Sequence, residues 1–157
     1  MTNWLHFLDP KTIEIFGQLA LSTLIGLSVG IERRLAHKFA GMRTHALVAM
    51  GSTLFTVVST SLNNPNVDPT RIAAQIVTGI GFLGAGLIVF QESKVKGLTT
   101  AAGVWAVAAI GVAVGFKLYA VSLFATFLTI MIFVILWPIE EKFFSREGNY
   151  RDKADLD

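Results

Sequence analysis

The chain has 157 residues, of which 53% are hydrophobic and 15% are charged, and its mean hydropathy is +0.60. Soluble domains are about one quarter charged, so this composition excludes an ordinary soluble protein and predicts that most of the chain lies in lipid. The formal net charge of +2 gives no indication of a nucleic-acid partner, and the absence of cysteine excludes disulfides, thiolate metal sites and cysteine nucleophiles.

Five apolar runs without a charged residue follow one another along the chain. A bilayer core about 30 Å thick takes about 17–25 helical residues to cross, so each run predicts one transmembrane helix. Asp9-Pro10 and Asp68-Pro69 each place an acidic N-cap before a proline, so we expect helices to begin near Pro10 and Pro69. The runs cover residues 15–31, 46–62, 72–90, 98–116 and 118–137.

The end of the chain changes character after Trp137. Pro138 is expected to end or bend the fifth helix. Residues 139–157 are expected to form a short polar cytoplasmic tail, with the last twelve or so disordered. The sequence therefore predicts one transmembrane domain over residues 1–138, an all-α polytopic bundle of five membrane helices.

Lysine and arginine are distributed unevenly between the two sides of the predicted bundle. Ten of them lie in the loop after the first run, in the loop with Lys94 and Lys96, and in the tail, whereas three lie on the other side. Positively charged loops stay in the cytoplasm. We therefore expect the N-terminus outside and the C-terminus in the cytoplasm.

Residues 79–86 read GIGFLGAG, which contains the GxGxxG pattern of dinucleotide-binding loops. That fingerprint needs a strand before it and an acid about 20 residues after it. Here the preceding residues indicate a helix, and Thr99–Val104 contains no acid. Close helix packing explains the glycines better, with a functional bend beside a cavity as the alternative. The candidate helix-packing residues are Gly26, Gly30, Gly79, Gly81, Gly84, Gly86, Gly111 and Gly115.

A GxSxG sequence at residues 26–30 resembles the turn that carries a nucleophilic serine. Such a turn joins a strand to a helix, whereas these residues lie inside a membrane helix. We therefore expect no enzyme, no catalytic residue and no cofactor.

The polar candidates for binding sit at the ends of the spans, because the apolar runs contain no ionisable residue. On the cytoplasmic side Glu32 can pair with Arg33 or Arg43, or the loop can bind lipid headgroups. On the outer side Arg71 opposes the helix dipole and can pair with Asp68 or reach lipid phosphates. The candidate binding residues are Glu32, Arg33, Arg43, His45, Arg71, Gln75, Thr99 and Thr100.

Four blocks of sequence, GLSVGIERR, AGMRTHALVAMGSTLF, DPTRIAAQIVTGIGFLGAGLI and VKGLTTAAGVWAVAAIGVAVG, occur in this order. Over about residues 17–130 the chain resembles the MgtC/SapB family of bacterial inner-membrane proteins. The resemblance implies a multi-pass inner-membrane domain linked to growth when magnesium is scarce. The positions that match the family pattern are Gly26, Gly30, Glu32, Arg33, Gly41, Arg43, Thr44, His45, Arg71, Gln75, Gly79, Gly81, Gly84, Gly86, Gly97, Thr99 and Thr100.

The chain departs from the family pattern in two places. The family often has an acid soon after the Glu-Arg pair, where this chain has Arg34. Larger members also carry a cytoplasmic domain after the last span, whereas this chain ends about twenty residues past Trp137. A cation site would thus lack one carboxylate, and a role that needs the C-terminal domain is not expected.

Three functions remain open from the sequence. The first is a regulator of magnesium adaptation that docks through its glycine-rich faces onto another membrane complex. The second is a homo-oligomeric transporter or channel for magnesium or another cation, with Glu32 as the one candidate metal ligand. The third is a protein that binds a lipid or a small anion at Arg71 and Gln75. The expected partners are the lipid bilayer and either further copies of the chain or another membrane complex.

Overall fold

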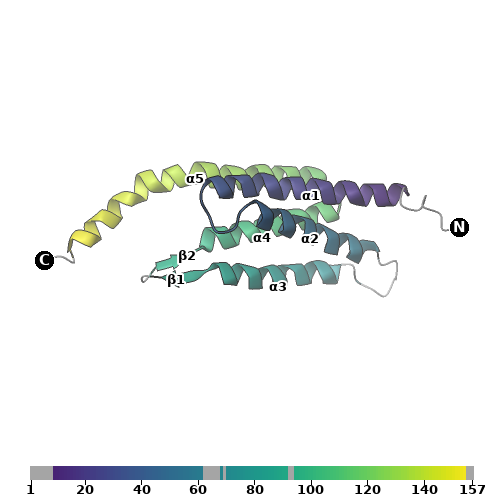
Figure 1. Ribbon diagram of the computed structural model, residues 1–157, viewed down its shortest axis with the longest axis horizontal. Helices are drawn as coiled ribbons and strands as arrows, with labels where there is room; N and C mark the ends of the chain where they lie inside the picture. Colours follow the sequence, from purple (N-terminus) through teal and green to yellow (C-terminus); the bar gives the residue numbers. More distant parts are fainter. Residues whose placement is uncertain (1–8, 62–67, 69, 92–93, 155–157) are drawn as a thin grey trace.

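A computed structural model describes residues 9–61, 68, 70–91 and 94–154, and their side chains except those of 137, 140, 141 and 143–154. It shows five helices and one short β-hairpin (Figure 1). In chain order the elements are α1 (Pro10–Leu35), α2 (Met42–Ser61), α3 (Thr70–Leu87), β1 (Val89–Gln91), β2 (Lys94–Lys96), α4 (Leu98–Gly115) and α5 (Tyr119–Ala154). Apart from the hairpin, the described fold is all-α, as the sequence predicts.

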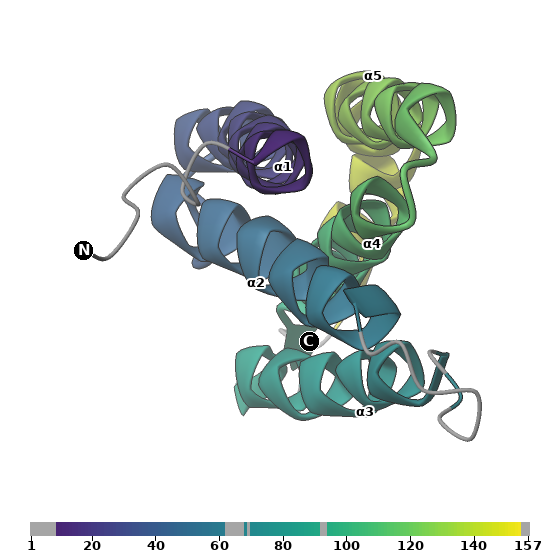
Figure 2. The ribbon, with the colours of Figure 1, turned by 90° about the vertical axis from the view of Figure 1, so that its right-hand side faces the viewer.

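The helices alternate in direction along one axis, so the connections gather at two ends of a bundle (Figure 1). The 36–41 loop and the hairpin lie at one end, which we name the hairpin end. The start of α3 and the 116–118 loop lie at the opposite end. Seen along the axis, α2 and α4 occupy the centre, with α1 and α5 to one side and α3 to the other (Figure 2).

The predicted helix starts are close to those observed. α1 begins at Pro10, with Asp9 as its N-cap, which confirms the first start. α3 begins at Thr70, while Pro69 lies outside the described residues. Asp68 Oδ1 accepts hydrogen bonds from the Thr70 backbone N–H at 2.8 Å and from the Thr70 hydroxyl at 2.7 Å. These bonds, the backbone one first, lower the pKa of Asp68 and keep its carboxylate charged at the start of α3.

Four of the described helices are long and apolar enough to cross a membrane, namely α1, α3, α4 and the Tyr119–Leu136 part of α5. The sequence predicts five crossings, and α2 does not meet this criterion. With 20 residues it is about 30 Å long, but its many hydroxyl groups make it less apolar. The buried polar side chains of α2 are His45, Ser52, Thr53, Thr56 and Ser59. These side chains are buried inside the bundle, and they lower the mean hydropathy of α2.

The third apolar run, predicted at 72–90, is shorter as a helix than expected. α3 ends at Leu87, and Val89–Gln91 pairs antiparallel with Lys94–Lys96. Gly97 follows with a φ of +92°, and a Cβ there would collide with the Leu87 carbonyl oxygen. The return into α4 therefore requires glycine. Helical periodicity does not separate a short strand from the end of an apolar helix, so the prediction was wrong over the last residues of the run.

α5 continues as a helix beyond Pro138 as far as Ala154. Figure 1 shows this part extending past the other helices at the hairpin end. An interior proline removes one backbone hydrogen bond and can kink a helix without ending it. The expected disorder of the last twelve or so residues is therefore wrong up to Ala154, and residues 155–157 lie outside the described part.

Two glycines of α1 bring its backbone directly against α2. A Cβ added at Gly26 would lie 2.5 Å from the His45 carbonyl oxygen, and one added at Gly30 would lie 2.5 Å from the Met42 Cα. Real Cβ atoms do not approach backbone so closely. Only glycine lets α1 and α2 pack at this distance.

Two glycines of α4 do the same on another face of α2. A Cβ at Gly111 would collide with the Ala49 carbonyl oxygen, and one at Gly115 would lie 2.5 Å from the Thr56 Cβ. The close approach also lets the Thr53 hydroxyl donate a 2.8 Å hydrogen bond to the Gly111 carbonyl oxygen. Small residues and polar bonds of this kind hold helices together in lipid, where the hydrophobic effect between helices is weak.

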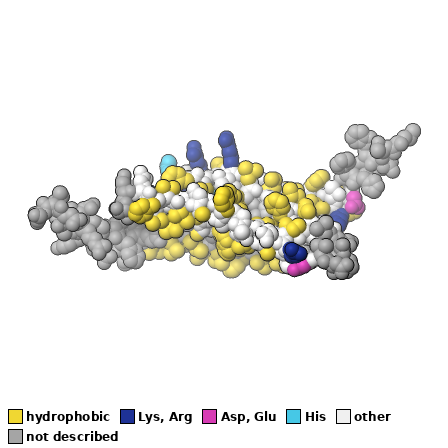
Figure 3. Space-filling model, turned by 90° about the horizontal axis from the view of Figure 1, so that it is seen from below, with side chains coloured by type: hydrophobic (Ala, Val, Ile, Leu, Met, Phe, Trp, Pro, Cys, Tyr) yellow, Lys and Arg dark blue, Asp and Glu magenta, His cyan; other side chains and the backbone are white. Residues whose placement is uncertain are grey.

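The glycines of α3 have different surroundings. A Cβ added at Gly79, Gly81 or Gly86 would meet no atom of the described residues within 4 Å. Gly84 is buried, with the Ala101 Cβ at 3.7 Å from the added atom. Seen from the side of α3, the surface is mainly hydrophobic, with charged side chains toward its edges (Figure 3). Of these four glycines, only Gly84 therefore touches the rest of the chain closely.

Candidate functional site

A buried charged cluster lies where α1 approaches the hairpin end. Arg33 is 3% exposed and pairs with the carboxylate of Glu32, with Nη2 at 2.6 Å from Oε1. The Arg33 guanidinium also stacks on the ring of Phe133 in α5, 3.6 Å from its centroid. Gly103 of α4 makes room for this ring, because a Cβ there would lie 2.7 Å from the Phe133 Cζ. Three helices thus enclose one cation.

His45 lies on α2 close to this cluster and is fully buried. Its Nδ1 donates to the Gly41 carbonyl oxygen at 2.9 Å. Its Nε2 is buried and has no hydrogen-bond partner among the described residues. The imidazole therefore fixes the 36–41 loop to the start of α2 through one nitrogen, and the second nitrogen remains an available acceptor.

The other candidates at the hairpin end do not join the cluster. Arg43 and Thr44 are exposed, and so is Thr99 at the start of α4. Thr100 is buried in the first turn of the same helix. Of the two pairings that the sequence leaves open for Glu32, the structure forms the one with Arg33.

Arg71 and Gln75 lie at the opposite end of the bundle, one helical turn apart on α3. Both are exposed, and neither is near Glu32 or His45. The eight candidate binding residues therefore form two separate groups. Among the residues that the structure describes, no three His, Asp or Glu side chains lie together as a possible metal site.

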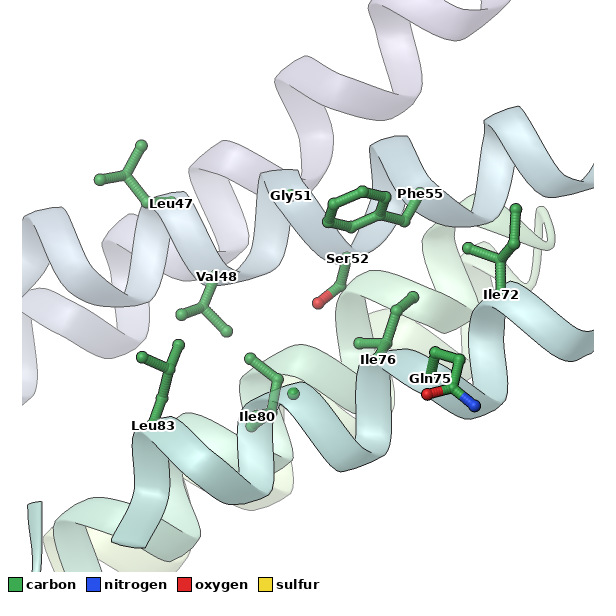
Figure 4. Close-up of a pocket in the computed structure, with 11 residues that line it drawn as sticks. Leu47, Val48, Gly51, Ser52, Phe55, Ile72, Gln75, Ile76, Ile80 and Leu83 are labelled. Carbon is green, nitrogen blue, oxygen red and sulfur yellow. The ribbon is translucent and has the colours of Figure 1, made fainter. Parts of the chain in front are cut away.

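An apolar groove of about 550 Å³ separates α2 from α3 (Figure 4). Two polar side chains, Ser52 and Gln75, also line it, and Figure 4 shows Gln75 beside Ile72, near the start of α3. The remaining large side chains in its walls are Leu47, Val48, Phe55, Ile72, Ile76, Ile80 and Leu83. The groove is therefore mainly hydrophobic, with the Ser52 hydroxyl near its middle and the Gln75 amide at the end near Arg71.

Sequence reasoning missed Gln18, a buried amide in the middle of α1. Its Nε2 donates to the carbonyl oxygens of Val114 and Gly115, at 2.9 and 3.2 Å. The last carbonyl groups of a helix have no intrahelical partner, so Gln18 satisfies the end of α4. An amide inside an apolar run is a signal of an interhelical bond, and it could have been read from the sequence. Phe133 gave no such signal among the many aromatic residues of its run.

The comparison with protein families matches residues 19–142 to the MgtC family. The chain belongs to the MgtC family. The match begins within α1 and extends through the membrane part of α5, so it includes the charged cluster, the groove and the small-residue contacts. The predicted family is thereby confirmed, and with it a multi-pass membrane protein of a bacterial family.

Individual MgtC relatives agree with this match. The chain is 41% identical over 128 residues to the "Putative magnesium transporter YhiD" of Escherichia coli K12, covering 77% of this chain and 60% of that protein. It is 46% identical over 121 residues to "Protein MgtC" of Brucella abortus, covering 77% of this chain and 50% of that protein. An uncharacterized Haemophilus influenzae protein is 35% identical over 152 residues, with 91% and 63% covered. The chain thus spans about half to two thirds of the length of these relatives. No solved structure matches.

Proposed function

We propose that this chain is a regulatory protein of the bacterial inner membrane, without catalytic activity of its own, that supports growth when magnesium is scarce. It acts by docking the outer face of α3 onto another membrane protein. Family membership supports the link to magnesium. The observation that carries the docking mode is the position of α3, at the edge of the bundle with its small residues directed outward.

A strip of small residues runs along the outer face of α3, with the exposed side chains of Val77 and Phe82 beside it. Ala74, Thr78, Gly81 and Ala85 are all exposed, and their spacing of three and four residues places them along one side of the helix. A Cβ at Gly81 would meet no described atom within 4 Å. Such a face permits the close backbone approach by which a second membrane helix associates. Gly84, in contrast, faces Ala101 and is not part of this surface.

The second possibility is a magnesium transporter or channel, the activity that the printed name of the Escherichia coli relative suggests for that protein. Magnesium prefers carboxylate and carbonyl oxygens together with its own waters. The Glu32 carboxylate, the one candidate ligand, is occupied by the buried Arg33 guanidinium. A neutralised carboxylate attracts a divalent cation weakly, so this pairing favours the regulatory function.

Orientation is part of the proposal. The hairpin end bears Lys94, Lys96 and the basic 33–43 segment, and it lies in the cytoplasm by the positive-inside rule. α2 also crosses the membrane, which gives five spans in all, since it is long enough and lies between α1, α3 and α4. Cysteines placed at Ala36 and at Lys117 would then react with an impermeant reagent from the inner and outer side, respectively.

The docking proposal is tested with a matched pair of substitutions, Gly81→Leu and Gly17→Leu. Both glycines are exposed and have open space around them, on α3 and α1 respectively. We expect Gly81→Leu to abolish growth in low-magnesium medium and Gly17→Leu to leave it unchanged. A photo-reactive residue at position 81, but not at 17, should form one discrete crosslink in intact cells.

The channel is tested separately with the purified chain in liposomes that contain a trapped magnesium indicator. We expect no magnesium flux. Flux by the chain alone, lost in Glu32→Gln, would establish transport and overturn the regulatory proposal. Normal growth of Gly81→Leu would remove the assigned docking face even if flux were absent.

A further inference from the structure

The groove between α2 and α3 has a shape that defines what can occupy it. Its α3 wall runs from Ile72 to Leu83, which is about 16 Å at 1.5 Å per residue. The hydrocarbon core of a bilayer is about 30 Å thick, so the groove is as long as one leaflet is deep. It begins near the end of α3 that meets the aqueous side and ends near the middle of the membrane.

The chemistry along the groove decides between a helix and a lipid. Its walls are apolar over about 16 Å, and its polar end lies one helical turn from Arg71. A phospholipid presents an apolar chain with an anionic phosphate at one end, which is the same order. The groove therefore suits a phospholipid, whereas the small residues on the outer face of α3 suit a helix.

The polar end of the groove carries a free positive charge. Arg71 lies one turn before Gln75, on the same edge of α3, and is exposed. It forms no ion pair within the described part of the chain. The nearby Asp68 carboxylate attracts it at longer range but accepts its hydrogen bonds from Thr70. The Arg71 guanidinium thus keeps its donors for an external anion, and it matches the geometry of a phosphate group.

We propose that this groove binds an anionic phospholipid of the outer leaflet. One acyl chain lies between α2 and α3, from Ile72 toward Leu83, and the phosphate is bound by Arg71. The amide of Gln75, at the polar end of the groove wall, donates to an ester oxygen of the lipid. The lipid fills the groove beside the contact of α3 with α2 and so supports the attachment of α3 to the bundle.

The acyl-chain part of the proposal is tested by filling the groove. Gly51 and Gly79 line it from α2 and α3, and a Cβ added at either position would meet no described atom within 4 Å. We would measure retained lipid by native mass spectrometry of the full chain, taken from vesicles of phosphatidylcholine and phosphatidylglycerol. Gly51→Leu and Gly79→Leu should each lose the bound lipid, and Gly17→Leu should retain it.

The headgroup part is tested with Arg71→Gln against Arg43→Gln, an exposed arginine on the first turn of α2. Both lipids offer a phosphate to Arg71, but in phosphatidylcholine the choline cation opposes the Arg71 charge. We therefore expect Arg71→Gln to lower the preference for phosphatidylglycerol over phosphatidylcholine by about tenfold, the size of one charge-assisted bond. Arg43→Gln should not change it. Inorganic phosphate alone should not displace the lipid, because it can reach Arg71 but cannot replace the contacts of the acyl chain with the groove.

Each other outcome counts against the proposal. Equal lipid retention in all variants would overturn it. Phosphate binding at Arg71 that survives Gly51→Leu would show a free-anion site in place of a lipid site. A dimer lost only in Gly51→Leu would show that a second copy occupies the groove. Because Gly81 lies outside the groove, the growth defect of Gly81→Leu is an independent result, and failure of either proposal can be recognised separately.

Discussion

The packing of α1, α2 and α4 differs sharply from that of α3. In the first group, glycines bring backbones into direct contact, and polar bonds from Gln18 and Thr53 connect the helices. Among the described residues of α3, only Ile80 and Gly84 are buried, and an open groove lies beside the contact of this helix with α2. Glycine therefore holds one part of this bundle together through close backbone contact and leaves another part open to outside molecules.

The largest expected effect comes from the buried cation of the tightly packed part. Arg33→Met should lower the free energy of unfolding by about 3 kcal/mol, because it leaves the partly buried Glu32 carboxylate without its partner. Denaturation in mixed micelles measures the change. The exposed neighbour Arg34 provides the control, and Arg34→Met should shift the midpoint little. Equal shifts of the midpoint for the two variants would show that the buried position of Arg33 adds no stability beyond that of an exposed arginine.

Exchange of glycines tests the comparison most directly. Gly26→Ala should destabilise the protein by about 1–3 kcal/mol, since the new methyl group overlaps the His45 carbonyl group. Gly81→Ala should instead stabilise it by about 0.5–1 kcal/mol, because alanine favours the helix and meets no neighbour. The same micelle unfolding assay reports both. A loss of stability in both variants would mean that α3 packs as tightly as α1.

The buried and exposed amides form a second matched pair. Gln18→Leu removes two hydrogen bonds to the end of α4 and should cost about 1 kcal/mol. Gln75→Leu on α3 should leave the stability in lipid-free micelles unchanged, because Gln75 is exposed there. Unfolding curves of both variants under identical conditions check this. An equal cost at both positions would contradict the looser attachment of α3.

The smallest effect concerns the exposed ion pair between Lys117 and Glu14, 2.8 Å apart at the opposite end. The hydrogen bond to Glu14 raises the pKa of Lys117. The ion pair therefore stabilises the folded protein fully below the ordinary lysine pKa, and this stabilisation disappears as the pH rises through the raised pKa of Lys117. Lys117→Met should lower the free energy of unfolding slightly at pH 7, and this difference should disappear as the pH rises through the raised pKa of Lys117. A difference that persists at high pH would point to packing in place of charge.

Local features of the sequence were sufficient for the five helices and the start of α1, because runs of apolar residues and proline caps depend on near neighbours. These local features did not predict which glycines contact another helix. Gly26 and Gly81 stand in similar small-residue patterns, and only the position of each helix in the bundle separates contact from exposure. The sequence left Glu32 open to pair with Arg33 or Arg43, and only the structure selects Arg33. The Phe133 ring over Arg33 comes from a helix about one hundred residues away, and no local pattern indicates it.

The hydroxyl-rich character of α2 has a consequence for how the protein is made. A segment that is only moderately apolar enters the membrane less readily on its own than its neighbours do. The Thr53 hydroxyl reaches its acceptor on α4 only after α4 has been synthesised, since Gly111 lies 58 residues later in the chain. The 36–41 loop is short, and the glycines of α1 contact α2 directly. We therefore expect insertion of α2, proposed above as a membrane span, to depend on α1 as a companion during synthesis.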